Sequence, residues 1–164
     1  CDMDEYDEAV AEYNITLNIR MKFCGKNSRD VATSMFGKGI VHTRMGQLQD
    51  ARNCFTECLR IRSLLSLDEN ENEIAEAHFY LGKMMRDMDN LDQGWYHLNQ
   101  ALKYKIKYYG QDHTQVSDVL FSLGVLNCER GDFEASLENY EEALRIYKFQ
   151  LGDDHLEVGT MMEN

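Results

Sequence analysis

The chain has 164 residues, enough for one domain with a sizeable core, and its 29 Asp and Glu against 17 Lys and Arg give a formal net charge of −12. This balance argues against nucleic acid or an anionic membrane as the main partner, because both need a concentrated basic surface. No run of apolar residues approaches the roughly 20 that cross a bilayer, so we expect no membrane insertion. The chain contains no proline. Since nothing then interrupts a helix, the sequence predicts an all-α fold.

A stripe of small and apolar residues, spaced three and four apart as on one face of a helix, recurs four times along the chain. The four copies, 42 or 43 residues apart, begin at Tyr6, Leu48, Leu91 and Phe133. A second stripe, which ends on a glycine, precedes each of the last three copies. The pattern indicates repeating units of a helix A, a tight turn and a longer helix B. Each pair would leave an apolar face that the next pair covers, as in a solenoid.

The expected solenoid occupies the whole chain. It comprises helix B of a first unit (4–26), a second unit (27–67), a third (68–110), a fourth (111–152) and the start of a fifth (153–164). This organisation predicts seven substantial helices and one turn of an eighth.

Both ends of the predicted array are ragged, and the chain opens with Cys1 rather than Met, so we expect a fragment of a longer array. The apolar stripe of the first unit lacks a preceding helix A; it consists of Tyr6, Ala9, Tyr13 and Leu17. Because an exposed apolar stripe is costly, we expect further repeats or a partner chain to cover it.

Within each unit, the spacing predicts a turn at Gly46, Asp89 and Gly131. The loops between units predict helix N-caps at Asn27, Asp112 and Asp154. Small residues are expected to let the two helices of a unit approach closely. The expected contacts are Gly39 with Ala51, Gly82 with Gly94, and Gly124 with Ser136.

Candidate chemical sites are few. The five cysteines are unevenly spaced and predict no disulfide framework, which indicates a reducing compartment, the cytoplasm or another one inside the cell. Cys54 and Cys58 are four residues apart on one helix but lack further ligands at zinc-site spacing, so we expect them in the core. His113 and His155 occupy equivalent loop positions that a repeat would hold apart, and we expect each to pack beside a cap. No catalytic motif is present, so we expect no catalysis, no cofactor and no metal.

Two charged segments are notable. The acidic stretch of Asp68, Glu69, Glu71, Glu73 and Glu76 is expected to be a solvated loop, with a docking site for a basic partner as the alternative. A basic cluster late in a helix B consists of Lys103, Lys105 and Lys107. We expect this cluster to stabilise the end of its helix through the helix dipole.

The pattern small–x6–Gly–x6–Gly–x–(Leu/Phe)–x2–small–x6–(Ala/Cys)-Leu resembles the tetratricopeptide repeat (TPR). The Gly-x-Asp-His-x-x-Val loop at residues 110–116 and 152–158 is similar to the long-helix repeats of kinesin light chains. The resemblance implies a right-handed α-solenoid of stacked antiparallel helix pairs. It also implies a protein-interaction scaffold or adaptor, with a cargo adaptor like kinesin light chain as one form.

In such arrays the helices A line a concave groove that binds a peptide or an amphipathic helix of a client protein. The residues that the resemblance places in this groove are Phe36, Ile40, Arg44, Phe79, Lys83, Arg86, Phe121 and Val125. Two family features differ: the loop proline is replaced by Thr114 and Leu156, and the helix-A position that often holds a groove-lining Asn holds Phe.

Two alternatives remain open at the level of sequence. The Phe rings either face a client or pack between neighbouring helices to complete the core. The protein is either a scaffold with a peptide-binding groove or a structural subunit embedded permanently in a larger complex, with no separate peptide ligand.

Overall fold

The computed structural model describes residues 2–65 and 70–151, which fold into seven α-helices and contain no strand. The helices are α1 (Asp2–Phe23), α2 (Arg29–Arg44), α3 (Leu48–Leu64), α4 (Glu71–Asp87), α5 (Leu91–Tyr109), α6 (Thr114–Glu129) and α7 (Phe133–Leu151). The predicted all-α fold with seven helices is confirmed. The predicted eighth helix, from Leu156 onward, lies outside the described residues.

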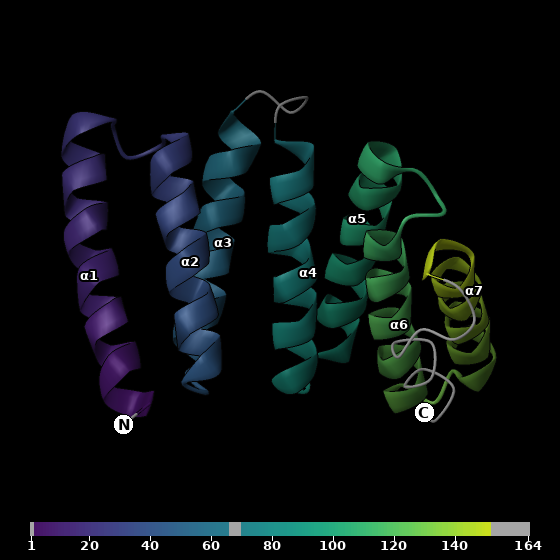
Figure 1. The fold of residues 1–164 in the computed structure, drawn as a ribbon. Helices are drawn as coiled ribbons and strands as arrows, with labels where there is room; N and C mark the ends of the chain where they lie inside the picture. Colours follow the sequence, from purple (N-terminus) through teal and green to yellow (C-terminus); the bar gives the residue numbers. More distant parts are fainter. Residues whose placement is uncertain (1, 66–69, 152–164) are drawn as a thin grey trace.

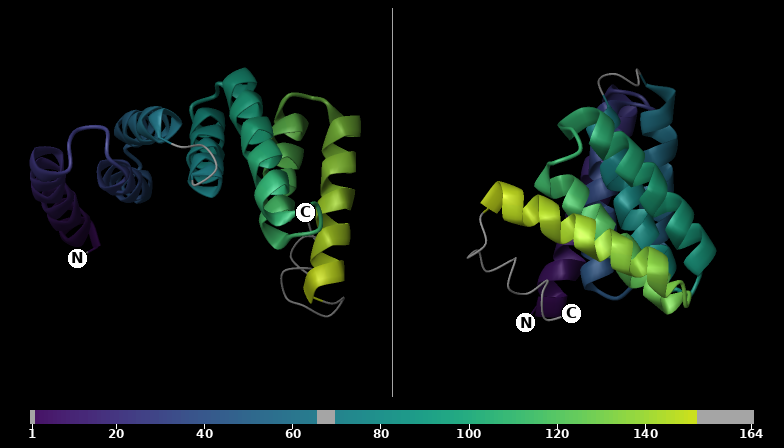
Figure 2. Two further views of the ribbon diagram at one scale, coloured as in Figure 1. Left: turned by 90° about the horizontal axis from the view of Figure 1, so that it is seen from above. Right: turned by 90° about the vertical axis from the view of Figure 1, so that its right-hand side faces the viewer.

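The helices follow one another across the molecule in chain order (Figure 1). Each helix packs mainly on its neighbours in sequence, and α4 also touches α6. Two further views show that the row twists, so that α7 is steeply inclined to the earlier helices (Figure 2). The pairs α2–α3, α4–α5 and α6–α7 are the helix A and helix B pairs that the repeat predicts.

The turn inside each pair is made as predicted. Gly46, Asp89 and Gly131 have φ angles of 71°, 58° and 80°, and Asp89 is the one non-glycine residue with a positive φ among those the structure describes. After each turn residue, the next amide donates a hydrogen bond to the carbonyl five residues earlier; these bonds are Gln47 to His42, Asn90 to Met85, and Asp132 to Asn127. This is the arrangement that closes a helix with a left-handed residue.

The two helices of a pair approach closely at the predicted small residues. A Cβ on Gly94 would lie 3.2 Å from the carbonyl oxygen of Gly82. The Ser136 hydroxyl donates a 2.7 Å hydrogen bond to the carbonyl oxygen of Gly124. Two of the predicted contacts between small residues are therefore confirmed.

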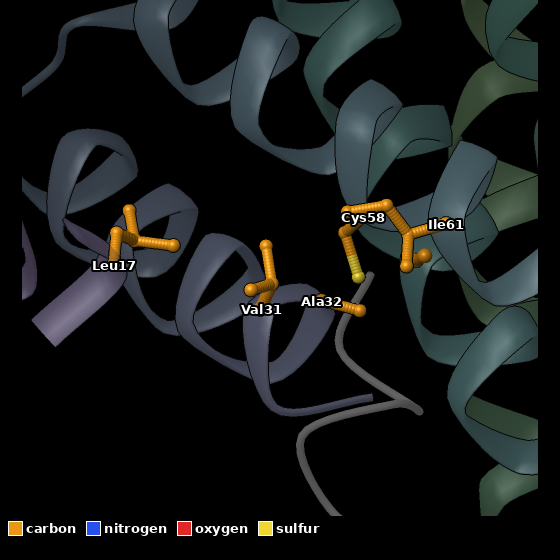
Figure 3. Close-up of a cluster of buried hydrophobic side chains, with 6 residues drawn as sticks. Leu17, Val31, Ala32, Cys58 and Ile61 are labelled. Atoms are coloured by element: carbon orange, nitrogen blue, oxygen red, sulfur yellow. The ribbon is translucent and has the colours of Figure 1, made fainter. Parts of the chain in front are cut away.

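The core between the pairs is built from residues of successive helices. Leu17 of α1 contributes to one buried cluster with Val31 and Ala32 of α2, and with Cys58 and Ile61 of α3 (Figure 3). Cys54 and Cys58 are both buried, as predicted, and burial raises the pKa of each thiol. The described residues hold no group of three or more His, Cys, Asp or Glu side chains placed to bind a metal ion.

Two of the predicted helix caps, Asn27 and Asp112, are wrong. Ser28 caps α2 by accepting a hydrogen bond from the Val31 amide, and His113 caps α6 by accepting one from the Gln115 amide. Each helix begins one residue later than the prediction assumed, which leaves Asn27 and Asp112 free to reach a helix B. Asn27 accepts a hydrogen bond from Arg60, and Asp112 forms an ion pair with Arg145.

His113 also stacks on Tyr109, with ring centroids 4.3 Å apart, so its predicted packing role is confirmed. Asp154 and His155 lie outside the described residues. None of the described helices is long and apolar enough to cross a bilayer.

Candidate functional site

The eight residues predicted to line a groove lie on the first helix of each unit. They are Phe36, Ile40 and Arg44 of α2, Phe79, Lys83 and Arg86 of α4, and Phe121 and Val125 of α6. Arg44 and Lys83 are exposed, and the other six are half-buried. The three Phe residues therefore keep part of their surface open to solvent.

The aromatic rings also pack against neighbouring helices. The Phe36 ring lies edge-on to the rings of Phe55 and Tyr80, at centroid distances of 5.5 and 5.3 Å. Phe55 is fully buried and stacks on Tyr80 at 5.3 Å, so one aromatic cluster joins α2, α3 and α4. Phe121 packs on Tyr140 with the two rings tilted, at a centroid distance of 5.3 Å. Phe36 and Phe121 thus contribute to packing while one side of each stays accessible.

A groove lies between α1 and α2, with a volume of about 540 Å³. We call it the α1–α2 groove; it is lined by Glu5, Tyr6, Ala9 and Tyr13 of α1 and by Phe36, Gly37, Ile40, Val41 and Arg44 of α2. Three of the eight predicted residues, Phe36, Ile40 and Arg44, line this groove. The walls are mainly apolar, with Glu5 and Arg44 as the charged residues.

Within this structure the first apolar stripe is covered only in part, so its coverage by further repeats or a partner chain stays a prediction. Tyr6, Ala9 and Tyr13 face α2 across the groove, and Leu17 is 4% exposed in the core beside α2. The physical reason is that a helix B contacts the helix A that follows it, as well as its own. The exposed apolar residues of α1 are instead Ile15, Ile19 and Phe23, at 62%, 53% and 78% exposure.

The candidate residues of α4 are more strongly engaged within the molecule. The Phe79 ring has the ammonium groups of Lys83 and Lys105 at 5.5 and 5.4 Å from its centroid, within the range of cation–π attraction. Arg86 forms an ion pair with Asp87 at 2.9 Å and lies 4.0 Å from Glu129. Of the α4 candidates, Lys83 is therefore the most accessible to a partner.

The acidic stretch is not a solvated loop over the part that the structure describes. Glu71, Glu73 and Glu76 belong to α4, whereas Asp68 and Glu69 lie outside the described residues. The three carboxylates pair with cations of the neighbouring helices B; the pairs are Glu71 with Lys107, Glu73 with Arg62, and Glu76 with Lys105. The prediction failed because the opposite charges come from another repeat position, far away in sequence.

The basic cluster is likewise different from its prediction. The Lys105 side chain is only 1% exposed and donates hydrogen bonds of 2.5 Å to Glu76 and to Gln115. Lys105 thus bridges α4 and α6 from α5, rather than stabilising the end of its own helix. Lys107 pairs with Glu71, and Lys103 alone of the three is exposed without an ion pair among the described residues.

Lys105 belongs to a polar position that recurs in every helix B. The equivalent residues, 42 or 43 apart, are Arg20, Arg62, Lys105 and Tyr147. Each bonds to a helix A: Arg20 to Ser34, Arg62 to Thr33, Lys105 to Glu76 and Gln115, and Tyr147 to Asp118. This position was not predicted because its residues differ in type and their partners come from other helices, although the spacing of 42 or 43 residues is present in the sequence.

Two histidines that the sequence did not connect lie side by side. The Nδ1 atoms of His78 in α4 and His97 in α5 are 2.9 Å apart, and the His78 ring stacks on Tyr104. Burial lowers the pKa of His78 to about 4, with a smaller contribution from repulsion by His97, and burial also lowers the pKa of His97. Both imidazoles are therefore neutral at pH 7.

This pair predicts a loss of stability in mild acid. An unfolded histidine binds a proton near pH 6.5, whereas folded His78 does so near pH 4, so its contribution is complete above pH 6.5 and is lost as the pH falls toward 4. Between pH 7 and 5, we expect His78 to lower the free energy of unfolding by about 2 kcal/mol. Urea denaturation at several pH values across this range measures how the free energy of unfolding changes with pH. In the double variant His78→Gln/His97→Gln, the free energy of unfolding should depend less on pH than in the unmodified protein. An equal pH dependence in the two proteins would show that this histidine pair is not the cause.

The chain is similar in sequence to known proteins. A family model described as the tetratricopeptide repeat matches residues 1–63 and 73–148. Protein KINESIN LIGHT CHAIN-RELATED 2 of Arabidopsis thaliana is 21% identical over 87% of this chain. Clustered mitochondria protein homolog of Aedes aegypti is 30% identical over 53% of this chain. The chain spans 21% and 6% of the lengths of these two relatives, respectively.

Solved structures show the same fold. The crystal structure of BtubC (BKLC) from P. vanneervenii superposes with a TM-score of 0.80 and 21% identity, covering 91% of this chain and 59% of that one. The nearly identical TPR-like repeats of a kinesin light chain candidate from Podosopora anserina give a TM-score of 0.80 at 15% identity, covering 98% and 75%. The chain belongs to the tetratricopeptide repeat family, and its repeats are of the kinesin light chain-like kind.

Proposed function

We propose that this chain is a non-catalytic interaction scaffold that binds an amphipathic helix or an extended apolar peptide of a client protein. The observation that carries the proposal is the row of half-buried apolar residues that would line a groove on the first helices of the units, Phe36 and Ile40 of α2 and Phe121 and Val125 of α6. Grooves of this kind suit a segment that inserts apolar side chains and leaves its polar face in water. The family supports a protein-interaction role in general, and the groove supports this particular mode.

The client's apolar anchors would contact Phe36 and Ile40 of α2, and the rest of the client would continue along α4 and α6. Phe79 has two cations against its ring, and Arg86 pairs with Asp87, so both are largely engaged inside the protein. Lys83 is exposed and free of an ion pair among the described residues, so it would contact the client's polar edge. In a longer array of this type, the scaffold would recruit cargo to a larger assembly, as the likeness to kinesin light chain-related proteins favours.

A structural subunit is the second candidate function, and one observation favours it. Ile15, Ile19 and Phe23 form an exposed apolar line along the outer side of α1. If that line is buried permanently in an assembly, the isolated protein should aggregate unless its partners are present. A scaffold with a transient client should instead be monodisperse in solution. Light scattering distinguishes the two cases.

The groove is tested by isolating clients from the native source with the intact protein and then titrating one client against variants. We expect Ile40→Ala to weaken binding about thirtyfold, because desolvated anchors typically contribute about 2 kcal/mol. Leu137→Ala, which shortens an exposed aliphatic side chain on α7, is the matched control and should bind normally. Equal affinity of the Ile40→Ala variant and the unmodified protein would contradict the proposal.

Phe79→Ala separates the two roles that the sequence left open for the Phe rings. Because Phe79 packs on the cluster of α5 and α6 and against two cations, we expect the variant to lose about 2 kcal/mol of stability. Its affinity for the client, measured at low temperature where the variant stays folded, should be nearly unchanged. Normal melting together with lost binding would show instead that Phe79 is a client contact.

A further inference from the structure

We propose that a small pit between α2 and α4 binds the side-chain amide of a Gln or Asn residue of the client. This inference rests on the proposed function and specifies one side chain that the client would carry. It derives from three features of the molecule: the size of the pit, a buried hydrogen-bond donor without a partner in its wall, and the way in which the next unit of the chain fills the same place.

The pit has a volume of about 80 Å³ and lies where three consecutive helices meet. Its walls are formed by Thr33 and Phe36 of α2, Cys58 and Arg62 of α3, and Glu73 and Glu76 of α4. This volume suits one side chain rather than a whole small molecule, whose sites usually exceed about 300 Å³. Because α2, α3 and α4 lie inside the array, with α1 and α5 on either side, repeats added at the ends would not fill the pit.

One wall carries a donor that the protein does not satisfy. Arg62 is 4% exposed, and its terminal nitrogens bond to Asn70 and Thr33, yet its Nε has no hydrogen-bond partner among the described residues. Burial raises the pKa of the neighbouring Cys58 thiol and Arg62 opposes this shift, but a thiol sulfur is only a weak acceptor. A buried donor of this kind costs stability until an acceptor reaches it.

The wall on α4 carries acceptors that are only partly used. Glu73 Oε1 lies 3.3 Å from Arg62. Glu76 Oε1 lies 2.5 Å from Lys105. The Oε2 atom of each carboxylate forms no hydrogen bond to a residue that the structure describes. The two carboxylates and the two cations cancel in charge, so a client carboxylate or ammonium would bring an unpaired charge into the pit, whereas a neutral amide would not.

A primary amide matches this set of groups. Its carbonyl oxygen can accept a hydrogen bond from Arg62 Nε, and its two N–H groups can donate to the carboxylate oxygens of Glu73 and Glu76. A carboxylate offers no donor, and an ammonium offers no acceptor. The methylene groups of the client's Gln or Asn would pack against Phe36 and Cys58.

The next unit of the chain uses the same arrangement with an amide of its own. The equivalents of Arg62, Glu73 and Glu76, 42 or 43 residues later, are Lys105, Gln115 and Asp118. The amide oxygen of Gln115 accepts a 2.5 Å hydrogen bond from Lys105, and its nitrogen donates a 3.3 Å hydrogen bond to Asp118. None of these three residues has a buried nitrogen or oxygen without a partner. An amide from the client would complete the same bridge at Arg62, where the chain supplies a carboxylate instead.

The test uses three probes of one size: propionamide, propionate and propylammonium. In NMR spectra of isotope-labelled protein, propionamide should shift the Nε–H signal of Arg62 and the backbone amides of Thr33 and Phe36 in a saturable manner. Propionate and propylammonium should each bind about tenfold more weakly, because each lacks one kind of matching hydrogen bond. Stronger binding of either ion would overturn the inference. So would the absence of a shift with all three probes, which would mean that the pit holds only water.

Two variants locate the effect. Arg62→Lys removes Nε and keeps the cation, so the preference for propionamide should disappear. Arg60→Lys changes an exposed arginine of the same helix and is the matched control, which should keep the preference. Glu73→Gln gives the pit a net positive charge and an amide of its own, so this variant should bind propionate more strongly than propionamide. A preference that survives both Arg62→Lys and Glu73→Gln would show that the probes bind elsewhere, and the inference would be overturned.

Binding of an isolated client separates this inference from the function on which it rests. If Ile40→Ala weakens client binding and Arg62→Lys does not, the client binds this face without an amide in the pit, and only the inference fails. If neither variant weakens client binding, the client does not use this face, and the proposed function fails together with the inference. A loss of client binding in both variants, with a normal response to Arg60→Lys, supports both.

Discussion

Removing the partners of Lys105 is expected to destabilise the protein far more than removing Lys105 itself. The Lys105 ammonium is 1% exposed and is satisfied by Glu76 and Gln115 at 2.5 Å. The double variant Glu76→Ala/Gln115→Ala leaves a buried cation without acceptors, and we expect it to lower the free energy of unfolding by about 3–4 kcal/mol. Urea denaturation at pH 7 measures this loss.

The matched variant is Lys105→Met, which keeps most of the length of the side chain and removes the charge. The Glu76 side chain is 29% exposed, so water can solvate its carboxylate once the Lys105 charge is gone. Because no fully buried charge is then left unpaired, we expect a change of about 1 kcal/mol or less. Methionine also suits contact with the Phe79 ring, which Lys105 approaches. If Lys105→Met is as destabilising as the double variant, the ion pair itself stabilises the fold, and the argument from desolvation is wrong.

Lys105 and Lys103 show which features of a side chain the repeat spacing predicts and which it does not. The two lysines are two residues apart on one helix, yet one is buried and the other exposed. The repeat spacing sets Lys105 in register with Arg20 and Arg62, and that register is the signal for its burial. What the register does not provide is the partner, because Glu76 and Gln115 come from two different units and meet only when the units stack.

For the groove, the sequence likewise predicted the residues of one helix face but not all of their contacts. The repeat pattern predicted Phe36 and Ile40 as residues of one face, and the structure places both beside the α1–α2 groove. Tyr80 was not predicted, although it replaces the small residues Gly37 and Ser122 of the equivalent positions and thereby fills the space between Phe36 and Phe55. A local departure from a repeat is visible in the sequence, but the neighbours that it contacts depend on the packing of three helices.

The prediction of the helix caps was wrong because the choice of cap depends on a contact with another helix. Asn27 and Ser28 are adjacent and both are good capping residues, so composition alone does not choose between them. The choice falls on Ser28 because Asn27 accepts a hydrogen bond from Arg60, on the helix that follows α2 in the same unit. The turn residues Gly46, Asp89 and Gly131 were predictable because the left-handed conformation is a local requirement, independent of any other helix.

Gly82 is the position at which the repeat geometry is expected to tolerate substitution least. A Cβ at this residue would lie 2.6 Å from Leu98 Cγ and 3.1 Å from the Leu98 backbone nitrogen, so a rotamer change alone does not relieve the contact. We expect Gly82→Ala to lower the free energy of unfolding by about 2 kcal/mol, and Gly82→Val by about 3 kcal/mol or more, as α4 and α5 are forced apart.

A double-mutant cycle tests whether the contact with Leu98 is the cause. Leu98→Ala alone should be destabilising because it leaves a cavity in the core. Combined with Gly82→Ala, it makes room for the added methyl group, so the pair should cost less than the sum of the two single changes by about 1 kcal/mol. Strict additivity would mean that the backbone of α5, rather than the Leu98 side chain, limits the approach of the two helices. In that case Gly82→Ala should also loosen the neighbouring contact, where the Gly82 carbonyl lies against Gly94, and amide hydrogen exchange along α5 would detect it.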